Sequence, residues 1–204
     1  MSDNQRKYEL KARAEQVAET RQRIVEAAAG LHVEVGPART TMTEIARRAG
    51  VQRATVYSHF PDDGELFAAC GDYSLARNPP PDPSAALALD EPVDRLRAVL
   101  ASFYAWYRTA ARGLENLQRD RRGLPGLDEA MVSRVDQPIS RLVDALAAGF
   151  AVGNRRRDDV HAMVALALDF WTWRRLAAEG LSDENAAALM AGAALASGGL
   201  LGKR

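Results

Sequence analysis

Residues 41–61, TMTEIARRAGVQRATVYSHFP, predict two short helices joined by a sharp turn. The first half of the stretch carries apolar residues at the spacing of one helical face: Met42, Ile45, Ala46 and Ala49. Thr41 precedes this run and Glu44 follows three residues later, which is the pattern of a capping box. Gly50 is expected to end the helix, because a residue without a Cβ readily adopts the left-handed conformation found at helix ends.

The second helix is expected to begin at Gln52 and to end before Pro61, with Val56 and Phe60 turned inward. Two helices joined by a tight turn are the geometry that places the second helix in the major groove of DNA. Arginine can bind guanine, glutamine can bind adenine, and hydroxyl and imidazole groups suit phosphate oxygens. The outward residues are Gln52, Arg53, Thr55, Tyr57, Ser58 and His59. The alternative is a solvated helix face in an ordinary bundle.

A longer stretch, residues 20–67, resembles the N-terminal domain of TetR-type transcriptional repressors. The matching residues are Thr20-Arg21, Ile24, Ala27-Ala28, Leu31, Glu34, Gly36, Thr40-Thr41, Ile45-Ala46, Ala49-Gly50-Val51, Thr55, Tyr57 and His59-Phe60-Pro61. The resemblance implies a DNA-binding surface formed by Thr41, Gln52, Arg53, Ala54, Thr55, Tyr57, Ser58 and His59. The sequence departs from the family pattern at His32, where phenylalanine is usual, at Gln52, where a capping serine is common, and at Asp63-Gly64, where Lys-Glu is usual.

Composition is that of a soluble globular protein of 204 residues, with zero net charge. Residues 1–60 nevertheless hold ten Lys/Arg against seven Asp/Glu, and a local basic patch is enough to contact phosphates. Cys70 is the single cysteine, which excludes an internal disulfide and favours a reducing cytoplasm. We expect it to be a buried apolar residue. The sequence shows neither a secretory signal nor an apolar run of membrane-spanning length.

The chain is expected to divide into an N-terminal extension (1–19), a helix-turn-helix domain (20–66) and a helical ligand-binding and dimerisation domain (67–204). For the extension we weigh a basic arm that touches DNA against a solvated, disordered tail, and favour the tail. A first helix is expected over residues 20–35, with Ile24, Ala28, Leu31 and Val35 inward. Another helix is expected over residues 62–76, followed by a stiff proline-rich link at 78–83.

The remainder is predicted to be helical, which makes the fold all-α: an N-terminal three-helix DNA-binding domain joined to a C-terminal helical bundle. Expected helices cover residues 91–110, 114–121, 127–152, 158–179 and 182–197. Pro138 predicts a kink in the third of these helices. Residues 154–157 are expected to form a turn.

Aromatic residues are concentrated on two of these helices and suit the walls of a small-molecule pocket, although such a stripe also suits a plain core. The candidate ligand-binding residues are Phe103, Trp106, Tyr107, Phe170 and Trp171. The resemblance implies that inducers bind in this bundle and that the last helices form a dimer. The dimer candidates are Val160, Val164, Leu166 and Leu168, with the small residues Ala187, Ala191, Ala194 and Gly198.

Three functions are weighed. The leading hypothesis is a regulator whose homodimer binds a palindromic DNA operator and is released by an unknown small-molecule effector, through movement of helix 62–76. The second is an all-α enzyme, for which the sequence offers no catalytic motif and three histidines, His32, His59 and His161. The third is an architectural DNA binder without a ligand. No second His or Cys lies at ligand spacing from His32, so we expect no metal and no cofactor.

Overall fold

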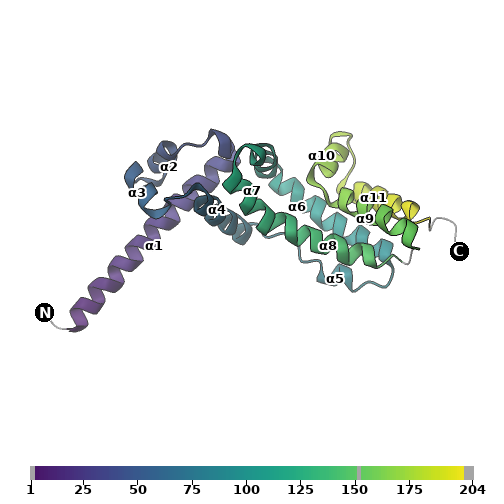
Figure 1. Cartoon of the computed structure of the whole chain (residues 1–204), viewed down its shortest axis with the longest axis horizontal. Coiled ribbons are helices and arrows are strands. Elements are labelled where there is room, and N and C mark those ends of the chain that lie inside the picture. The colour runs from purple at the N-terminus through teal and green to yellow at the C-terminus, as the bar shows by residue number, and fades with distance from the viewer. Residues whose placement is uncertain (1–2, 151–152, 200–204) are drawn as a thin grey trace. The chain divides into compact units, whose positions relative to one another are not determined.

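The computed structural model of the chain describes residues 3–150 and 153–199, and within these ranges it contains helices and turns but no strand. Figure 1 shows the helices along the chain. Their bounds are α1 Asp3–Glu34, α2 Met42–Ala49, α3 Arg53–His59, α4 Asp63–Arg77, α5 Ser84–Leu87, α6 Pro92–Asp120, α7 Pro125–Met131, α8 Gln137–Ala148, α9 Asn154–Leu168, α10 Phe170–Ala178 and α11 Asp183–Ser197. Short 3₁₀ turns cover Pro37–Arg39 and Arg121–Gly123. The all-α prediction is confirmed.

The chain forms two compact units. The first contains Met1–Pro79 and Arg112–Met131, and the second contains Pro80–Ala111 and Val132–Arg204. The long helix α6 contributes its first part to the second unit and its last nine residues to the first. Among the described helices, none combines the length and the apolar character needed to cross a membrane.

In the first unit, α1 is longer than expected. It begins at Asp3 rather than near Thr20, so residues 3–19 are helical and not a disordered tail. The extension is rich in Lys, Arg, Glu, Gln and Ala, which are good helix formers, and it contains neither Gly nor Pro. Ile24, Ala28 and Leu31 are buried as predicted, whereas Val35 lies beyond the helix and is exposed.

Helix α4 follows the expected course. The side chain of Asp62 accepts a hydrogen bond from the backbone N–H of Gly64, which caps the helix start. Leu66 and Cys70 are buried against the core of α1, α2 and α3. The proline-rich stretch 78–83 is not helical, as predicted, and the first unit's N-terminal segment ends within it.

Helix α6 differs from the two helices predicted for this part of the chain. The expected separate helices 91–110 and 114–121 form one helix of 29 residues, without a break at Gly113. A Cβ at Gly113 would lie 3.3 Å from a methyl group of Val33, so this glycine allows α6 to approach α1 closely within the first unit.

The second unit also differs from the expected layout. The helix predicted for 127–152 is interrupted by a π-helical turn at Val132–Asp136, just before Pro138. Proline has no N–H to donate to the carbonyl of residue 134, and its ring would clash with that carbonyl in a regular helix. Its predicted end at Val152 lies outside the described residues. Residues 154–157, expected as a turn, belong to α9. The helix predicted for 158–179 breaks at Asp169, whose carboxylate accepts the N–H of Thr172 and caps α10.

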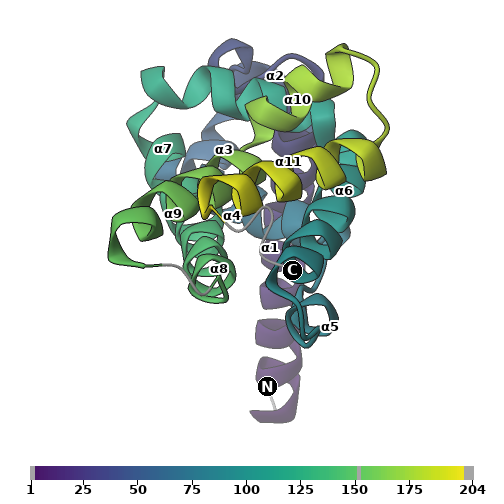
Figure 2. The ribbon, with the colours of Figure 1, turned by 90° about the vertical axis from the view of Figure 1, so that its right-hand side faces the viewer.

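Helices α9 and α11 pack on each other inside the second unit (Figures 1 and 2). Most of the residues predicted for a dimer interface are therefore buried within the single chain: Val160, Val164, Leu168, Ala187, Ala191, Ala194 and Gly198. The small residues of α11 allow two helices of the same chain to approach closely. Leu166 is the member of the predicted set that stays exposed, at 50 %.

Candidate nucleic-acid interface

The turn between α2 and α3 has the predicted geometry. The Thr41 hydroxyl accepts the backbone N–H of Glu44 at 3.2 Å, which caps α2. The half of the predicted capping box that Thr41 provides is therefore present. The Glu44 carboxylate forms an ion pair with Arg47 at 2.6 Å. Gly50 is left-handed, with φ 67° and ψ 38°, and ends α2 as expected. This turn fixes the direction in which α3 leaves α2.

Helix α3 buries one side and exposes the other. Val56 and Phe60 are fully buried, as predicted. Gln52, Arg53, Ala54, Tyr57 and Ser58 are exposed, and Thr55 and His59 are partly exposed. The structure thus brings together, on one short helix and its start, seven of the eight residues predicted to contact DNA; the eighth, Thr41, lies exposed at the start of α2.

Two exposed side chains of α3 hold each other in place. A guanidinium nitrogen of Arg53 donates a hydrogen bond to the Tyr57 hydroxyl at 2.9 Å, and the guanidinium carbon lies 5.3 Å from the centre of the Tyr57 ring. The pair presents donors of the kind that bind base edges and phosphates. Gln52 makes no capping hydrogen bond, so its amide is available to a partner.

The helices behind α3 are fastened by arginines. Arg48 of α2 forms a two-pronged ion pair with Glu34 of α1, at 2.6 and 2.7 Å. Arg23 of α1 donates to the carbonyl of Ala49 at 3.2 Å, at the end of α2. These contacts hold the support on which α3 is presented.

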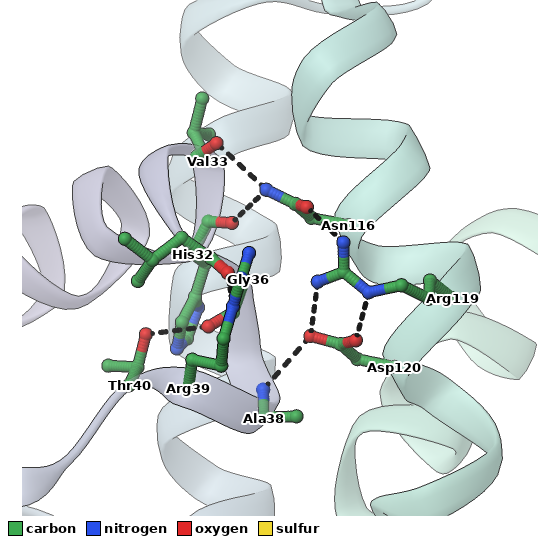
Figure 3. A network of polar contacts seen from close by, with 10 residues as sticks. His32, Val33, Gly36, Ala38, Arg39, Thr40, Asn116, Arg119 and Asp120 are labelled. Carbon is green, nitrogen blue, oxygen red and sulfur yellow. Dashed lines mark hydrogen bonds and ion pairs between the residues drawn. The ribbon is translucent and has the colours of Figure 1, made fainter.

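The end of α1 is capped by side chains from α6, which sequence reasoning missed. Asn116 donates its amide to the carbonyls of His32 and Val33, at 3.2 and 2.9 Å (Figure 3). Arg112 donates to the carbonyl of Glu34 at 2.8 Å. These carbonyls belong to the last turn of α1 and lack partners inside the helix. No local pattern signals this pairing, because the partners are about eighty residues apart.

Asp120 extends the same network to the turn after α1. Its carboxylate accepts the backbone N–H of Ala38 at 3.0 Å and forms an ion pair with Arg119 at 2.7 Å, while Arg119 also donates to Asn116 (Figure 3). Burial raises the pKa of the Asp120 carboxyl, but the Arg119 guanidinium and the Ala38 N–H outweigh burial, and the net direction is downward. The end of α6 is therefore an ionised clamp on the helix-turn-helix domain.

His32 lies in the core beside this clamp, as the sequence predicted. It is 6 % exposed, and its ring centre lies 5.4 Å from that of Phe67. Burial lowers the pKa of His32 to about 4, while Asp120 acts in the opposite direction. The described residues contain no group of His, Cys, Asp and Glu side chains suited to a metal ion.

The predicted ligand residues lie in the second unit. Phe103, Tyr107 and Phe170 are buried in one aromatic cluster, which also contains Tyr104 and Trp173. Trp106 is partly exposed at its edge, and Trp171 is 46 % exposed while its ring contacts Phe170. A groove of about 580 Å³ is found elsewhere, between α1 and α4 of the first unit, and none of the five residues lines it. Their ligand role stays a prediction.

Tyrosine hydroxyls of α6 bind the last carbonyls of α9. Tyr104 and Tyr107 donate to the carbonyls of Ala167 and Leu168, at 2.7 and 2.6 Å. These are carbonyls of the last turn of α9, and the hydroxyls replace the helical partners that the break at Asp169 removes. Both tyrosines are thus structural supports of the aromatic cluster.

Comparisons with known proteins agree with this geometry. The family described as "Bacterial regulatory proteins, tetR family" matches residues 24–70. An uncharacterised HTH-type transcriptional regulator of Mycobacterium tuberculosis (strain ATCC 25618 / H37Rv) is 50 % identical over 52 residues, which is 26 % of this chain and 28 % of that protein. This sequence likeness therefore covers just over a quarter of the relative's length.

The fold likeness is wider. A TetR-like transcriptional regulator from Rhodococcus sp. RHA1 matches with a TM-score of 0.60 and 23 % identity, over 90 % of this chain and 97 % of that one. NalD of Pseudomonas aeruginosa, described as the secondary repressor of the MexAB-OprM multidrug efflux pump, matches with a TM-score of 0.57 and 20 % identity, over the same shares. At these identities the likeness shows the fold.

The capped turn, the exposed face of α3 and the matched stretch together identify residues 24–70 as a helix-turn-helix domain of the kind found in TetR-family regulators. The fold of the described chain is similar to that of TetR-like proteins.

Proposed function

We propose that the protein is a ligand-responsive repressor that acts as a homodimer on a palindromic operator. The observation that carries the proposal is the exposed face of α3, on which Arg53 and Tyr57 are held together over a buried Val56. A single copy of α3 can contact few base pairs. A dimer presents two copies related by a twofold axis, which can bind half-sites about 34 Å apart. The named repressor with a similar fold, NalD, supports the repressor role by analogy only.

The dimer surface is assigned to the outward side of the last helices, since their inner residues are already buried. Leu166 of α9, Trp171 of α10 and Leu189 of α11 are exposed large apolar residues, at 50, 46 and 54 %. Exposed apolar side chains of this size on neighbouring elements are typical of an interface between subunits. Leu189→Glu is expected to shift the sedimentation of the protein toward the monomer.

The effector is assigned to the aromatic cluster on α6 and α10, where rings with polar handles suit an uncharged aromatic or amphipathic small molecule. Helix α6 contains Tyr107 of this cluster and Asn116 and Asp120 of the clamp, and so it passes from one unit to the other. The chain also passes between the two units at residues 79–80 and 131–132. A ligand that favours one arrangement of the cluster can therefore act on the clamp. The single buried thiol, Cys70, suits a cytoplasmic protein.

The test is DNA binding by full-length protein, using sites that the wild type selects from random-sequence duplexes. Arg53→Ala with Tyr57→Ala is expected to lose at least about tenfold in affinity for the selected site, because each good base contact contributes about 1–3 kcal/mol. Arg97→Ala is the matched control, an exposed arginine of the second unit. Unchanged affinity of the double variant would contradict the role of α3. A thermal-shift screen in which no small molecule stabilises the protein would favour a ligand-independent DNA binder.

A further inference from the structure

The N-terminal half of α1 is a helix that the rest of the first unit does not cover. Every side chain described from Lys7 to Glu19 is exposed, and the buried residues of α1 begin at Ile24. Figure 1 shows this half projecting from the three-helix domain as a straight extension. A regular helix rises about 1.5 Å per residue, so the stretch from Lys7 to Arg21 extends over roughly 21 Å.

Charge is segregated around this extension. At about 100° per residue, the basic side chains Lys7, Lys11, Arg13 and Arg21 fall within one arc of roughly 160°, here called the basic face. Glu15 and Glu19 lie in the opposite arc, in line with Glu26. Lys11 forms an ion pair with Glu15 at 3.9 Å, at the border between the two sides. A solvated helix needs no such separation, whereas a helix that contacts a polyanion does.

The basic face is turned to the side on which α1 packs against the rest of the domain. Ile24, Ala28 and Leu31 are buried on this side, and Leu10 and Val17 continue their seven-residue spacing into the extension. The arc of the basic face contains this line. The basic face therefore shares the side of α1 that is buried at Ile24 and Leu31, whereas α2 contacts α1 through Arg23 and Glu34, which lie outside this arc.

Arg21 joins the basic face to α3. Its guanidinium lies over the ring of Phe60, 4.4 Å from the ring centre, and Phe60 directly follows α3. The opposite end of α1 is the end held by Asn116. The extension therefore starts beside the end of α3 and runs away from the α6 clamp, which places one end of the basic face, at Arg21, next to the helix proposed to read DNA.

We propose that the N-terminal half of α1 is a second DNA contact, whose basic face binds phosphates of the duplex flanking the site read by α3. The proposal rests on the proposed DNA reading by α3. A duplex carries one phosphate charge per about 1.7 Å of axis, so a cationic surface of this length meets several phosphates wherever it lies along DNA. The contact adds affinity and salt dependence, but not base specificity.

The charge of the basic face favours DNA, rather than a second copy of this chain, as the partner that binds there. Leu10 and Val17 are exposed, at 63 and 51 %, but they are flanked on the same face by Arg13 and Arg21. Two such helices packed through this face would bring cations together without acidic partners. Phosphates satisfy the cations, and the aliphatic residues can lie along the sugar edge.

The experiment uses full-length protein and two duplexes that contain its selected site, one ending at the half-sites and one extended on each side by about one helical turn (~10 base pairs). The basic-face variant is Lys7→Ala, Lys11→Ala and Arg13→Ala, which preserves helix propensity on exposed positions. The matched control is Glu9→Ala, Glu15→Ala and Glu19→Ala on the same extension. Circular dichroism checks that both variants keep their helix content.

We expect the basic-face variant to bind the extended duplex at least about tenfold more weakly at low salt, with the slope of log affinity against log salt reduced by about 2 to 3 per protomer. Its binding to the short duplex should stay within about twofold of wild type, and the control should bind both duplexes at least as tightly as wild type. Equal affinity and slope of wild type and basic-face variant on the extended duplex would overturn the proposal. So would a change in sedimentation of the DNA-free variant, which would point to a second copy.

The two proposals fail in different ways. If α3 does not read DNA, Arg53→Ala with Tyr57→Ala binds the short duplex as tightly as wild type. If only the role of the extension is wrong, Arg53→Ala with Tyr57→Ala still weakens binding to the short duplex. The basic-face variant then binds the extended duplex as tightly as wild type.

Discussion

Asn116 donates its side-chain amide to the carbonyl oxygen of Val33 at 2.9 Å, and so caps the last turn of α1 from a helix that begins in the other unit of the chain. The same amide also serves the carbonyl of His32. Both acceptors would otherwise be left without a partner near the buried core, which makes this one side chain a connection between fold stability and the presentation of α3.

Asn116→Ala is expected to destabilise the first unit by about 1–3 kcal/mol, the cost of leaving buried polar groups unpaired. The measurement can separate the units, because all three tryptophans, Trp106, Trp171 and Trp173, lie in the second unit. Unfolding followed by far-UV circular dichroism should shift to lower temperature more than unfolding followed by tryptophan fluorescence. Thr109→Ala, an exposed change on the same helix, should shift neither signal. A wild-type transition for Asn116→Ala would contradict the cap.

Gly36 and Gly50 are expected to respond differently to alanine. Gly50 has φ 67° and ψ 38°, and a Cβ there would have no neighbour closer than 3.8 Å, so Gly50→Ala should cost about 1–2 kcal/mol of backbone strain. Gly36 has φ 97° and ψ 153°, a region that glycine alone adopts readily. A Cβ there would also lie 2.4 Å from Arg119 and 2.6 Å from Asp120.

Gly36→Ala should therefore cost more than Gly50→Ala, about 3 kcal/mol or above, since steric displacement of the clamp adds to the strain. Denaturant unfolding followed by circular dichroism gives both values in one experiment. Equal losses for the two variants would show that the clamp does not press on Gly36.

Local signals predicted the part of the fold that local chemistry controls. Thr41, Gly50 and Pro61 each impose a helix start, a helix end or a stop through their own backbone and side chain, and the structure places α2 and α3 as these residues require. The same holds for the burial of Val56 and Phe60 and for the proline-rich stretch 78–83.

The helix boundaries that the sequence did not predict are associated with contacts between residues far apart in the chain. Gly113 looks like a helix break, yet it is the point where α6 approaches Val33 of α1. At the break at Asp169, hydroxyls of Tyr104 and Tyr107, more than sixty residues earlier, donate to the last carbonyls of α9. The predicted boundaries of the three domains, at 19–20 and 66–67, stay predictions, as do the DNA and ligand roles of the individual residues.

Cys70 is expected to resist alkylation in the folded protein. It is 5 % exposed, its thiol donates to the carbonyl of Val25, and burial raises its pKa to about 12. At pH 8 only about one thiol in ten thousand would be ionised, and the thiolate is the nucleophile. Iodoacetamide should modify the native protein very slowly and the denatured protein rapidly, as followed by mass spectrometry. Rapid labelling of native protein would mean that α4 separates readily from α1.

His32 predicts a pH dependence of stability. Burial lowers its pKa to about 4 in the folded protein, against about 6.5 in the unfolded chain. Between these values the unfolded chain binds a proton that the folded chain does not, so stability is full above pH 6.5 and falls as pH decreases toward 4. The loss amounts to about 3 kcal/mol over this window.

His32→Phe should abolish this loss, because phenylalanine has no proton to bind and can keep the ring contact with Phe67. Denaturant unfolding at pH 7 and pH 5, followed by circular dichroism, measures the difference. His161→Gln is the matched control, because it removes an exposed imidazole of the second unit and should leave the dependence unchanged. If His32→Phe loses as much stability as wild type between the two pH values, then His32 is protonated in the folded protein, and the buried site beside Asp120 must already hold the charge.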